Sequence, residues 1–456
     1  MRCPSAKGGM AMGIERALAF SAEYANPEKF DSFRKHLDPL WIEQALEATG
    51  TATIRRRRLP ADQVVWVVLA MALFRDESIE SVVSKLDLAI GGQAMTTVSK
   101  SSIAKARARL GKEPMQWLFE RCSEVWAKRS AEAHRFDGLE VYGIDGSTLR
   151  VADSEENRSA FGGQSGRGGT ESGYPLVRVV TLMVLRSHLL RAVSFTPYRD
   201  TSELHDAVPL CAHLPDRSLV ILDRAYLCAP LLLALQHDET ERHWLTRARS
   251  STKYRVLENF GDGDELVEMN VSSEARRDEP SLPKTWIARA VRYQRPGHPA
   301  RVLLTSLRDP KRYPAQEIAA LYHERWELEL GYDELKTELL EAEETIRSQR
   351  PEGVYQELWG IVLAYNMIRV EIERVAAEAR VPPTRISFVE SLRLVRIEWS
   401  WLSVVSPGTI PKRLAKLRAN IKRYLLPARR ERTYPRAVKR KMSNYDRKRP
   451  RVEIAN

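Results

Sequence analysis

The chain has 456 residues and a hydrophobic content of 43%, enough for two to four globular units with substantial cores. Its longest unbroken apolar run, residues 64–74, is too short to cross a bilayer, and no charged start followed by an apolar core marks a secretion signal. The four cysteines are scattered without paired spacing, which argues against a zinc cluster or a disulfide framework. We therefore expect a cytoplasmic protein with no membrane partner.

The positive charge is concentrated near the C-terminal end. The formal net charge is +12, yet residues 411–451 alone hold 17 Lys and Arg against two acids. This concentration predicts a polyanionic partner, with the basic tail as its most obvious point of contact. The alternative is a disordered tail that aids solubility or binds nucleic acid without selectivity.

The first 137 residues are predicted to form a helical domain. Amphipathic or apolar stretches typical of helices recur at residues 40–48, 61–74, 80–88 and 101–110. In the last of these, serines suited to capping precede Lys105 and Arg109, which lie one helical turn apart. This segment is either a helix that enters a DNA groove or a solvated basic helix.

A mixed α/β core is predicted from Leu139 onward. Strand patterns occur at LEVYGID, PLVRVVTLMVL, HLLRAVSFT, SLVILD and HWLTRA, with helical patterns before and after the fourth. Three strands, helix, strand, helix, strand is the order of a ribonuclease H-like sheet, in which the first and fourth strands end side by side. We therefore expect Asp145 and Asp223, which end those two strands, to come together.

These patterns divide the rest of the chain into four parts. Residues 138–250 are predicted to form the first part of the core, 251–310 a β-rich insertion, 311–350 the core helix with Glu329, and 351–456 a helical C-terminal region with the basic tail.

The glycine-rich stretch 161–175 lacks the lysine and the strand-to-helix context of a nucleotide-binding loop, so ATP binding is not expected. We interpret it as a mobile loop near the active site, where Arg167 can touch DNA.

Residues 322–336 are predicted to be one helical segment with a polar row on one face. The row consists of Tyr322, Arg325, Glu329 and Lys336, spaced by 3, 4 and 7 residues. A neighbouring stripe of leucines at positions 321, 328, 335 and 339 is suited to packing on a core. Such a row can hold a metal ion by its glutamate and grip a phosphate by its two cations. The plainer interpretation is a solvated face with ion pairs. We expect Glu327 and Glu338 to point away from the row into solvent.

The spacing Tyr, two residues, Arg, three, Glu, six, Lys resembles the signature of the insertion sequence four family of bacterial DDE transposases. The resemblance extends to IDGSTLR around Asp145, LVILDRAY around Asp223, the LLTS segment at residues 303–306 and the basic tail YPRAVKRKMSNYDRKRP. An N-terminal helical region that includes DESIESVVSKL also fits, so the resemblance covers nearly the whole chain.

The resemblance implies a site in which Asp145, Asp223 and Glu329 hold two Mg²⁺ ions, for which Mn²⁺ can substitute. The remaining members of the row would hold the DNA phosphates beside the cut. Arg224 and Tyr226, which follow Asp223, are further candidate DNA contacts.

The resemblance also implies a reaction and its partners. Such an enzyme cleaves double-stranded DNA at the terminal repeats of its element and transfers the 3′ ends to target DNA without ATP, as a homodimer that pairs two ends and associates with the nucleoid. In this family the N-terminal helices contribute to recognition of the repeats. The rival interpretation is a catalytically silent or domesticated DNA-binding regulator. A repair nuclease on the same fold would have no obvious use for the complete row.

One position departs from the family pattern. Some members stack a flipped base on a Trp just before the LLTS segment, where this chain has Arg301. Trp286, Tyr293 or Arg301 itself are the candidates for that contact.

Overall fold

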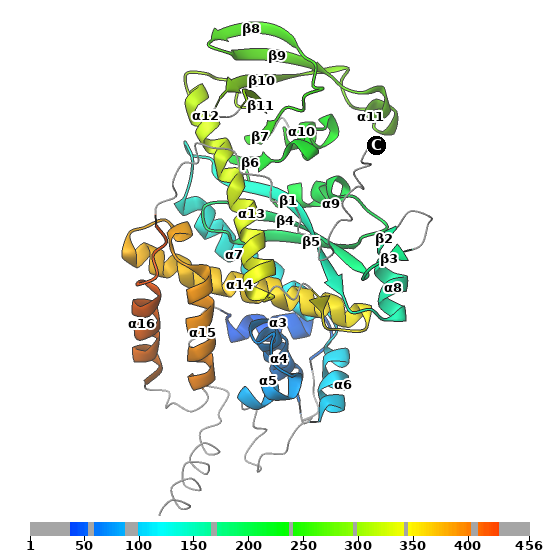
Figure 1. Ribbon diagram of the computed structural model, residues 1–456, viewed down its shortest axis with the longest axis vertical. Helices are drawn as coiled ribbons and strands as arrows, with labels where there is room; N and C mark the ends of the chain where they lie inside the picture. The colour runs from blue at the N-terminus through cyan, green and yellow to red at the C-terminus, as the bar shows by residue number, and fades with distance from the viewer. Residues whose placement is uncertain are drawn as a thin grey trace, which may run out of the picture.

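The computed structural model describes most of the chain. The described residues are 37–52, 59–86, 99–165, 171–236, 240–294, 299–341, 345–402 and 409–427. A large sheet occupies the upper part of the molecule and most of the helices the lower part, with one long helix between them (Figure 1).

Four N-terminal helices coincide with the predicted apolar stretches, namely α3 (Pro39–Ala48), α4 (Ala61–Leu73), α5 (Ile79–Lys85) and α6 (Lys100–Leu110). A fifth helix, α7 (Glu113–Ala133), lies outside those stretches. The predicted helix over residues 80–88 ends at Lys85, and 87–98 lie outside the described part of the chain. Ser99 caps α6 as expected, because its side chain accepts a hydrogen bond from the Ser102 N–H. α4 is buried over almost its whole length, since it packs against α3, α6 and α14 (Pro351–Ala379).

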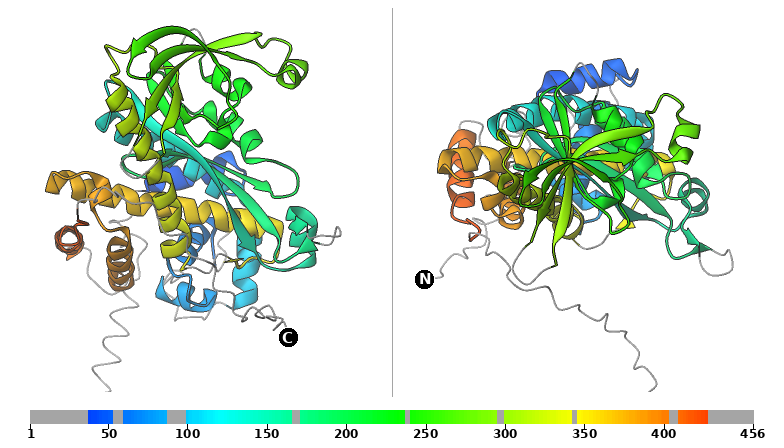
Figure 2. Two further views of the ribbon diagram at one scale, coloured as in Figure 1. Left: turned by 45° about the horizontal axis from the view of Figure 1, so that its top comes forward. Right: turned by 90° about the horizontal axis from the view of Figure 1, so that it is seen from above.

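The core is a ten-stranded sheet with the order β5-β4-β1-β6-β7-β11-β10-β9-β8, and β12 pairs with β1. The strands of its first half are β1 (Glu140–Val151), β4 (Leu176–Val184), β5 (Leu190–Pro197), β6 (Ser218–Leu222) and β7 (Arg242–Arg247). β4 runs antiparallel to β1 and β5, whereas β6 and β7 run parallel to β1. This arrangement is ribonuclease H-like, so the predicted fold class is confirmed. Seen from above, the strands fan out with the usual twist (Figure 2).

Short helices connect the core strands. α9 (Glu203–Cys211) lies between β5 and β6 along the chain, and η2 (Arg224–Tyr226) and α10 (Ala229–Leu235) lie between β6 and β7. The region between β1 and β4 holds α8 (Glu155–Phe161) and two-residue strands β2 (Gln164–Ser165) and β3 (Glu171–Ser172). All residues of β6 are buried, as its unbroken apolar sequence predicts.

The predicted β-rich insertion extends the core sheet. Its elements are β8 (Arg255–Gly261), β9 (Asp264–Asn270), α11 (Ser273–Asp278), β10 (Thr285–Tyr293) and β11 (Arg301–Thr305). β11 pairs antiparallel with β7, so the LLTS segment joins the insertion directly to the last core strand.

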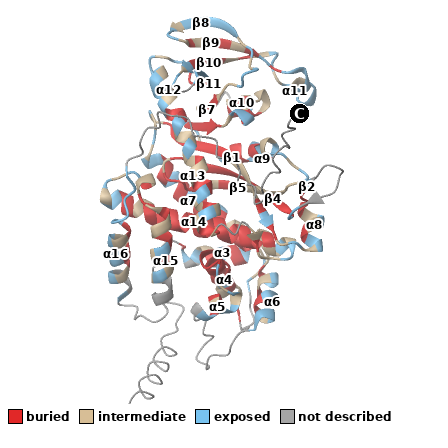
Figure 3. Cartoon of the chain, viewed as in Figure 1, coloured by how far each residue is buried: buried red, intermediate tan, exposed pale blue. Residues whose placement is uncertain are grey.

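The C-terminal half returns to helices. The helical stretch with the polar row comprises α12 (Ala315–Tyr322), η3 (His323–Arg325), α13 (Trp326–Asp333) and η4 (Glu334–Leu339), and β12 (Thr345–Ile346) follows. The long α14 lies in the buried centre of the molecule (Figure 3). η5 (Pro383–Arg385), α15 (Phe388–Leu402) and α16 (Ile410–Ile421) complete the described chain. Trp359 and Tyr365 of α14 are core residues.

Candidate active site

Asp145 and Asp223 lie at adjacent positions of the central sheet. β1 and β6 are parallel neighbours, and Ile144 pairs with Leu222 in their register. Asp145 is the next residue of β1, and Asp223 directly follows the last residue of β6; neighbouring strands lie about 4.8 Å apart. The expectation that Asp145 ends its strand is wrong, because β1 runs on to Val151. The meeting of the two segments, predicted from the order of the strands, is therefore confirmed. Asp145 accepts a hydrogen bond from the Gly146 N–H at 2.9 Å.

The electrostatic environment of Asp145 disfavours its ionised form. Burial raises the pKa of Asp145 to about 6, and the negative charges of Glu203 and Asp223 add to the rise. The Gly146 N–H and the Arg325 guanidinium act in the opposite direction without cancelling it. Burial thus makes an ionised Asp145 unfavourable, and a nearby divalent cation would stabilise the ionised carboxylate.

The helix α13 packs closely onto the sheet beside Asp145. A side chain at Gly143 in β1 would come within 2.8 Å of Leu328, and one at Gly331 in α13 within 2.4 Å of Met183. The absence of a Cβ atom at both glycines therefore permits this close approach. The Tyr332 hydroxyl of α13 donates a hydrogen bond to the backbone carbonyl of Asp145 at 2.7 Å. This contact holds α13 against β1 at the predicted catalytic residue.

The polar row does not lie on a single uniform α-helix. Tyr322 ends α12, Arg325 ends the 3₁₀ turn η3, Glu329 belongs to α13, and Lys336 lies in the π-helical segment η4. The expectation of regular α-helical spacing is wrong for this reason, although the helical turns run on without a break. Lys336 approaches the sheet, where its Nζ lies 3.3 Å from the Ser147 hydroxyl in β1. The four leucines of the neighbouring stripe are all buried, as predicted.

Arg325 and Glu329 form an ion pair within the row. The Arg325 guanidinium donates to a Glu329 carboxylate oxygen at 2.7 Å, and the side chains are 20% and 38% exposed. Burial lowers the pKa of Arg325, but the hydrogen bond to Glu329 and nearby negative charges outweigh it and raise the pKa overall. Across the described ranges, no three His, Cys, Asp or Glu side chains are close enough to hold a metal ion. In this structure Glu329 is therefore paired with Arg325 and does not form a metal-binding group with the two aspartates.

Tyr322 is buried at the end of α12. Burial raises its pKa, while Arg325 and Arg247 lower it and Asp223 adds to the rise. Tyr322 thus lies among charged groups at the ends of β6 and β7. Arg247, the last residue of β7, could not be found from the sequence because no motif marks it.

Three expectations from the sequence need correction. Glu327 does not point into solvent, because its carboxylate lies 2.8 Å from the imidazole of the buried His188. Tyr226 is only 2% exposed, so it is not a surface contact for DNA. Trp286 is 5% exposed and packs against Trp244, which makes it unsuitable for base stacking.

Several of the other predicted DNA contacts lie on the surface. Exposed side chains are found at Lys105, Arg109, Arg224 and Arg301, whereas Arg167 lies outside the described residues. Tyr293 is partly buried against His323 and pairs in register with Arg301, so these two stacking candidates lie opposite each other on β10 and β11.

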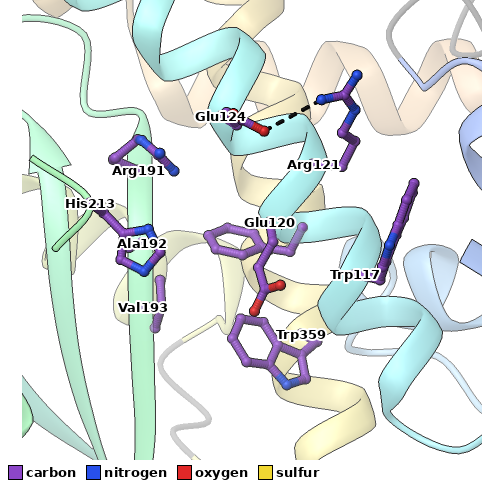
Figure 4. Close-up of a pocket in the computed structure, with 10 residues that line it drawn as sticks. Trp117, Glu120, Arg121, Glu124, Arg191, Ala192, Val193, His213 and Trp359 are labelled. Carbon is purple, nitrogen blue, oxygen red and sulfur yellow. Dashed lines mark hydrogen bonds and ion pairs between the residues drawn. The ribbon is translucent and has the colours of Figure 1, made fainter. Parts of the chain in front are cut away.

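A cavity elsewhere in the molecule is unrelated to this site. It has a volume of about 370 Å³ between α7, β5 and α14, and its lining includes Trp117, Glu120, Arg191, His213 and Trp359 (Figure 4). None of the predicted site residues lines it. Among the described helices, none is long and apolar enough to span a membrane.

Comparison with known proteins gives consistent matches. The family model "Insertion element 4 transposase N-terminal" matches residues 27–120, and the model "Transposase DDE domain" matches residues 137–367. The relative "Transposase InsG for insertion sequence element IS4" of Escherichia coli (strain K12) is 36% identical over 95% of this chain and 98% of its own length. "Putative transposase InsZ" of the same organism is 35% identical over 51% of this chain and 76% of its own length.

Among solved structures, the cryo-EM structure of the piggyBac transposase synaptic complex with hairpin DNA aligns with a TM-score of 0.39 and 12% identity, over 90% of this chain and 85% of that one. The domain model covers the ribonuclease H-like core, and the similarity to InsG extends over nearly both full chains. The chain therefore belongs to the insertion sequence four family of DDE transposases, metal-dependent enzymes that cleave DNA and transfer its strands.

Proposed function

We propose that Asp145, Asp223 and Glu329 are the catalytic carboxylates of this transposase and hold two Mg²⁺ ions, for which Mn²⁺ can substitute. When bound, the ions activate a water and stabilise the leaving oxygen of the cleaved phosphodiester. The observation that supports this most is the register of β1 and β6, which brings the two aspartates side by side. The raised pKa of Asp145 is further support, because its charge lacks sufficient compensation from the protein.

In this proposal Arg325 and Glu329 exchange partners when DNA binds. A phosphate competes for the Arg325 guanidinium, which can hold it by two parallel hydrogen bonds. Glu329 is then released from its ion pair and can turn toward the aspartates. Lys336, near Ser147 on β1, and the hydroxyl of Tyr322 would contact the phosphates on either side of the cut.

The DNA partners follow from the reaction. We propose that residues 1–137 bind the terminal repeats of the element and that the exposed Lys105 and Arg109 contact its backbone. Arg224 and Arg301 would touch DNA near the core, and the basic tail would hold DNA without selectivity. A homodimer would pair the two element ends before strand transfer, and the DNA-bound protein would be found with the nucleoid.

The test is cleavage of a labelled duplex that carries the element's own end, with Mg²⁺, by the wild-type chain and by Asp145→Asn. We expect the wild type to nick the end and the variant to bind it with nearly unchanged affinity without nicking. Cleavage by Asp145→Asn would show that Asp145 is not a catalytic carboxylate. Binding without nicking by both proteins would instead favour the catalytically silent DNA-binding regulator.

A further inference from the structure

A further carboxylate, which no sequence motif marks, lies beside Asp145. Glu203 is the first residue of α9, behind the capping Ser202, and α9 packs against β1, β4 and β5. A Cβ atom at Gly146 would lie 2.6 Å from the carboxyl carbon of Glu203, so the carboxylate rests directly on the backbone next to Asp145. Gly146 leaves room for the carboxylate at this place, and a larger residue would displace it.

A second observation, which does not depend on the acids, concerns the hydroxyl of Tyr226. Tyr226 is 2% exposed, and its hydroxyl has no hydrogen-bond partner among the residues that the structure describes. It interacts electrostatically with three carboxylates, those of Asp145, Glu203 and Asp223. A buried hydroxyl that lacks a partner is unfavourable. Its position among the carboxylates therefore indicates that a polar group binds there.

The protein neutralises Glu203 only in part. Among the described residues, Glu203 forms an ion pair with Arg178 of β4, whose guanidinium lies 3.7 Å from a Glu203 oxygen, beyond hydrogen-bonding distance. Arg178 also lies 3.8 Å from Asp206, so one guanidinium serves two acids. A carboxylate in the first turn of a helix is stabilised by the helix dipole, but this does not explain its contact with Gly146.

We propose that Glu203 is a further acidic residue of the active site, which helps to hold a divalent cation beside Asp145, with the Tyr226 hydroxyl bonded to the ligands of that cation. This inference rests on the proposed role of Asp145 as a metal ligand. Carboxylate oxygens and bound waters are the ligands that Mg²⁺ prefers, and a phenol can donate to the former or accept from the latter.

The experiment measures Mn²⁺ affinity of the full chain in complex with the element-end duplex, from the EPR signal of free Mn²⁺. We expect Glu203→Gln to weaken binding about tenfold, as the loss of a supporting ligand does at other metal sites. Glu155→Gln is the matched control, because Glu155 is the first residue of α8 behind its capping Ser154 and thus has the same helix position. It should bind Mn²⁺ as the wild type does. Wild-type affinity in Glu203→Gln would overturn the inference.

Asp145→Asn separates this inference from the proposed function. If Asp145→Asn keeps wild-type Mn²⁺ affinity, the proposed metal site is wrong and the role of Glu203 fails with it. If Asp145→Asn loses Mn²⁺ while Glu203→Gln retains it, only the role of Glu203 is wrong.

Tyr226→Phe tests the hydroxyl. It should leave thermal stability unchanged or higher, because the removed hydroxyl has no protein partner, while Mn²⁺ binding becomes several-fold weaker. Wild-type Mn²⁺ affinity in this variant would overturn the role given to Tyr226.

Discussion

At the scale of single residues, an ionised Asp145 destabilises the folded chain when no cation is bound. Its pKa rises from the ordinary 3.8 to about 6 on folding, chiefly because it is buried. Since the folded pKa is higher, the folded state gains stability from the proton at low pH and loses it as the pH rises through 6. The full loss corresponds to about 3 kcal/mol of unfolding free energy above that pH.

We therefore predict that Asp145→Asn is more stable than the wild type in EDTA at pH 8, by about 1–3 kcal/mol. The difference should shrink as the pH falls through 6 and disappear near pH 4, where the folded wild type already holds its proton. Urea unfolding of both proteins at pH 8 and pH 4.5 checks this. A less stable variant at pH 8 would show that the carboxylate is not disfavoured there. Added Mg²⁺ should stabilise the wild type alone.

The residues of this site differ in how far the sequence reveals them. Asp145, Asp223 and Glu329 each belong to a local pattern, either an apolar strand or the spaced row, so they could be proposed from the sequence. Glu203 and Tyr332 belong to no pattern, because their contacts with β1 arise only when distant segments pack together. Local periodicity carries no information about such contacts.

At the scale of elements, a buried polar cluster anchors the helical stretch that carries the row. His188, in the turn between β4 and β5, contacts Glu327 at 2.8 Å and Glu334 at 3.2 Å. Arg369 of α14 donates to His188 and forms an ion pair with Glu334. Burial alone would raise the pKa of Glu334, but Arg369 and His188 lower it to about 2. The cluster thus ties α13 and η4 to both the sheet and α14.

We predict that Arg369→Met lowers the free energy of unfolding by about 3–5 kcal/mol at pH 7, because it leaves Glu334 buried without its main cation. The deficit should decrease as the pH falls below 4.5. The stability that the wild type gains from the depressed pKa of Glu334 is complete above pH 4.5 and is lost as the pH falls to about 2. Arg374→Met, at a partly exposed position of the same helix, is the control and should change stability little. Denaturant unfolding at pH 7 and pH 4 measures both. A deficit that does not change with pH would contradict the role assigned to Glu334.

The sequence predicted this element and its buried leucine stripe, but not its changes of helix type. The stripe follows from apolar spacing, which tolerates small changes in winding. The π-helical turn at η4 coincides with the buried contacts of Glu334, and those contacts come from His188 and Arg369, far away in the chain. The expectation that Glu327 is solvated failed for the same reason.

At the scale of the whole molecule, the basic C-terminal region begins with a segment that packs on the fold, from α16 to Leu426. α16 belongs to the fold, because Ile421 is fully buried and Arg418 pairs with Glu371 at 2.5 Å. The chain stays attached as far as Leu426, whose N–H donates to the carbonyl of Arg385 at 2.7 Å. Residues 428–456, which lie outside the described part, hold 11 Lys and Arg against three acids. Removal of the tail should therefore begin after Pro427, since a cut at 411 would also remove a packed helix.

We predict that a chain ending at Pro427 folds normally and binds the element-end duplex more weakly, by about 10- to 100-fold at 100 mM salt. The slope of log affinity against log salt concentration falls by about 0.9 for every phosphate that the protein no longer neutralises, so it should decrease by several units. A full-length chain in which the 11 basic residues of 428–456 are changed to Gln keeps the length of the tail but not its positive charge. It should bind DNA as weakly as the truncated chain does. Titrations at four salt concentrations give the slope. If it stays at the wild-type value in both variants, the tail does not contact DNA, and the salt dependence must come from the basic residues of the folded chain.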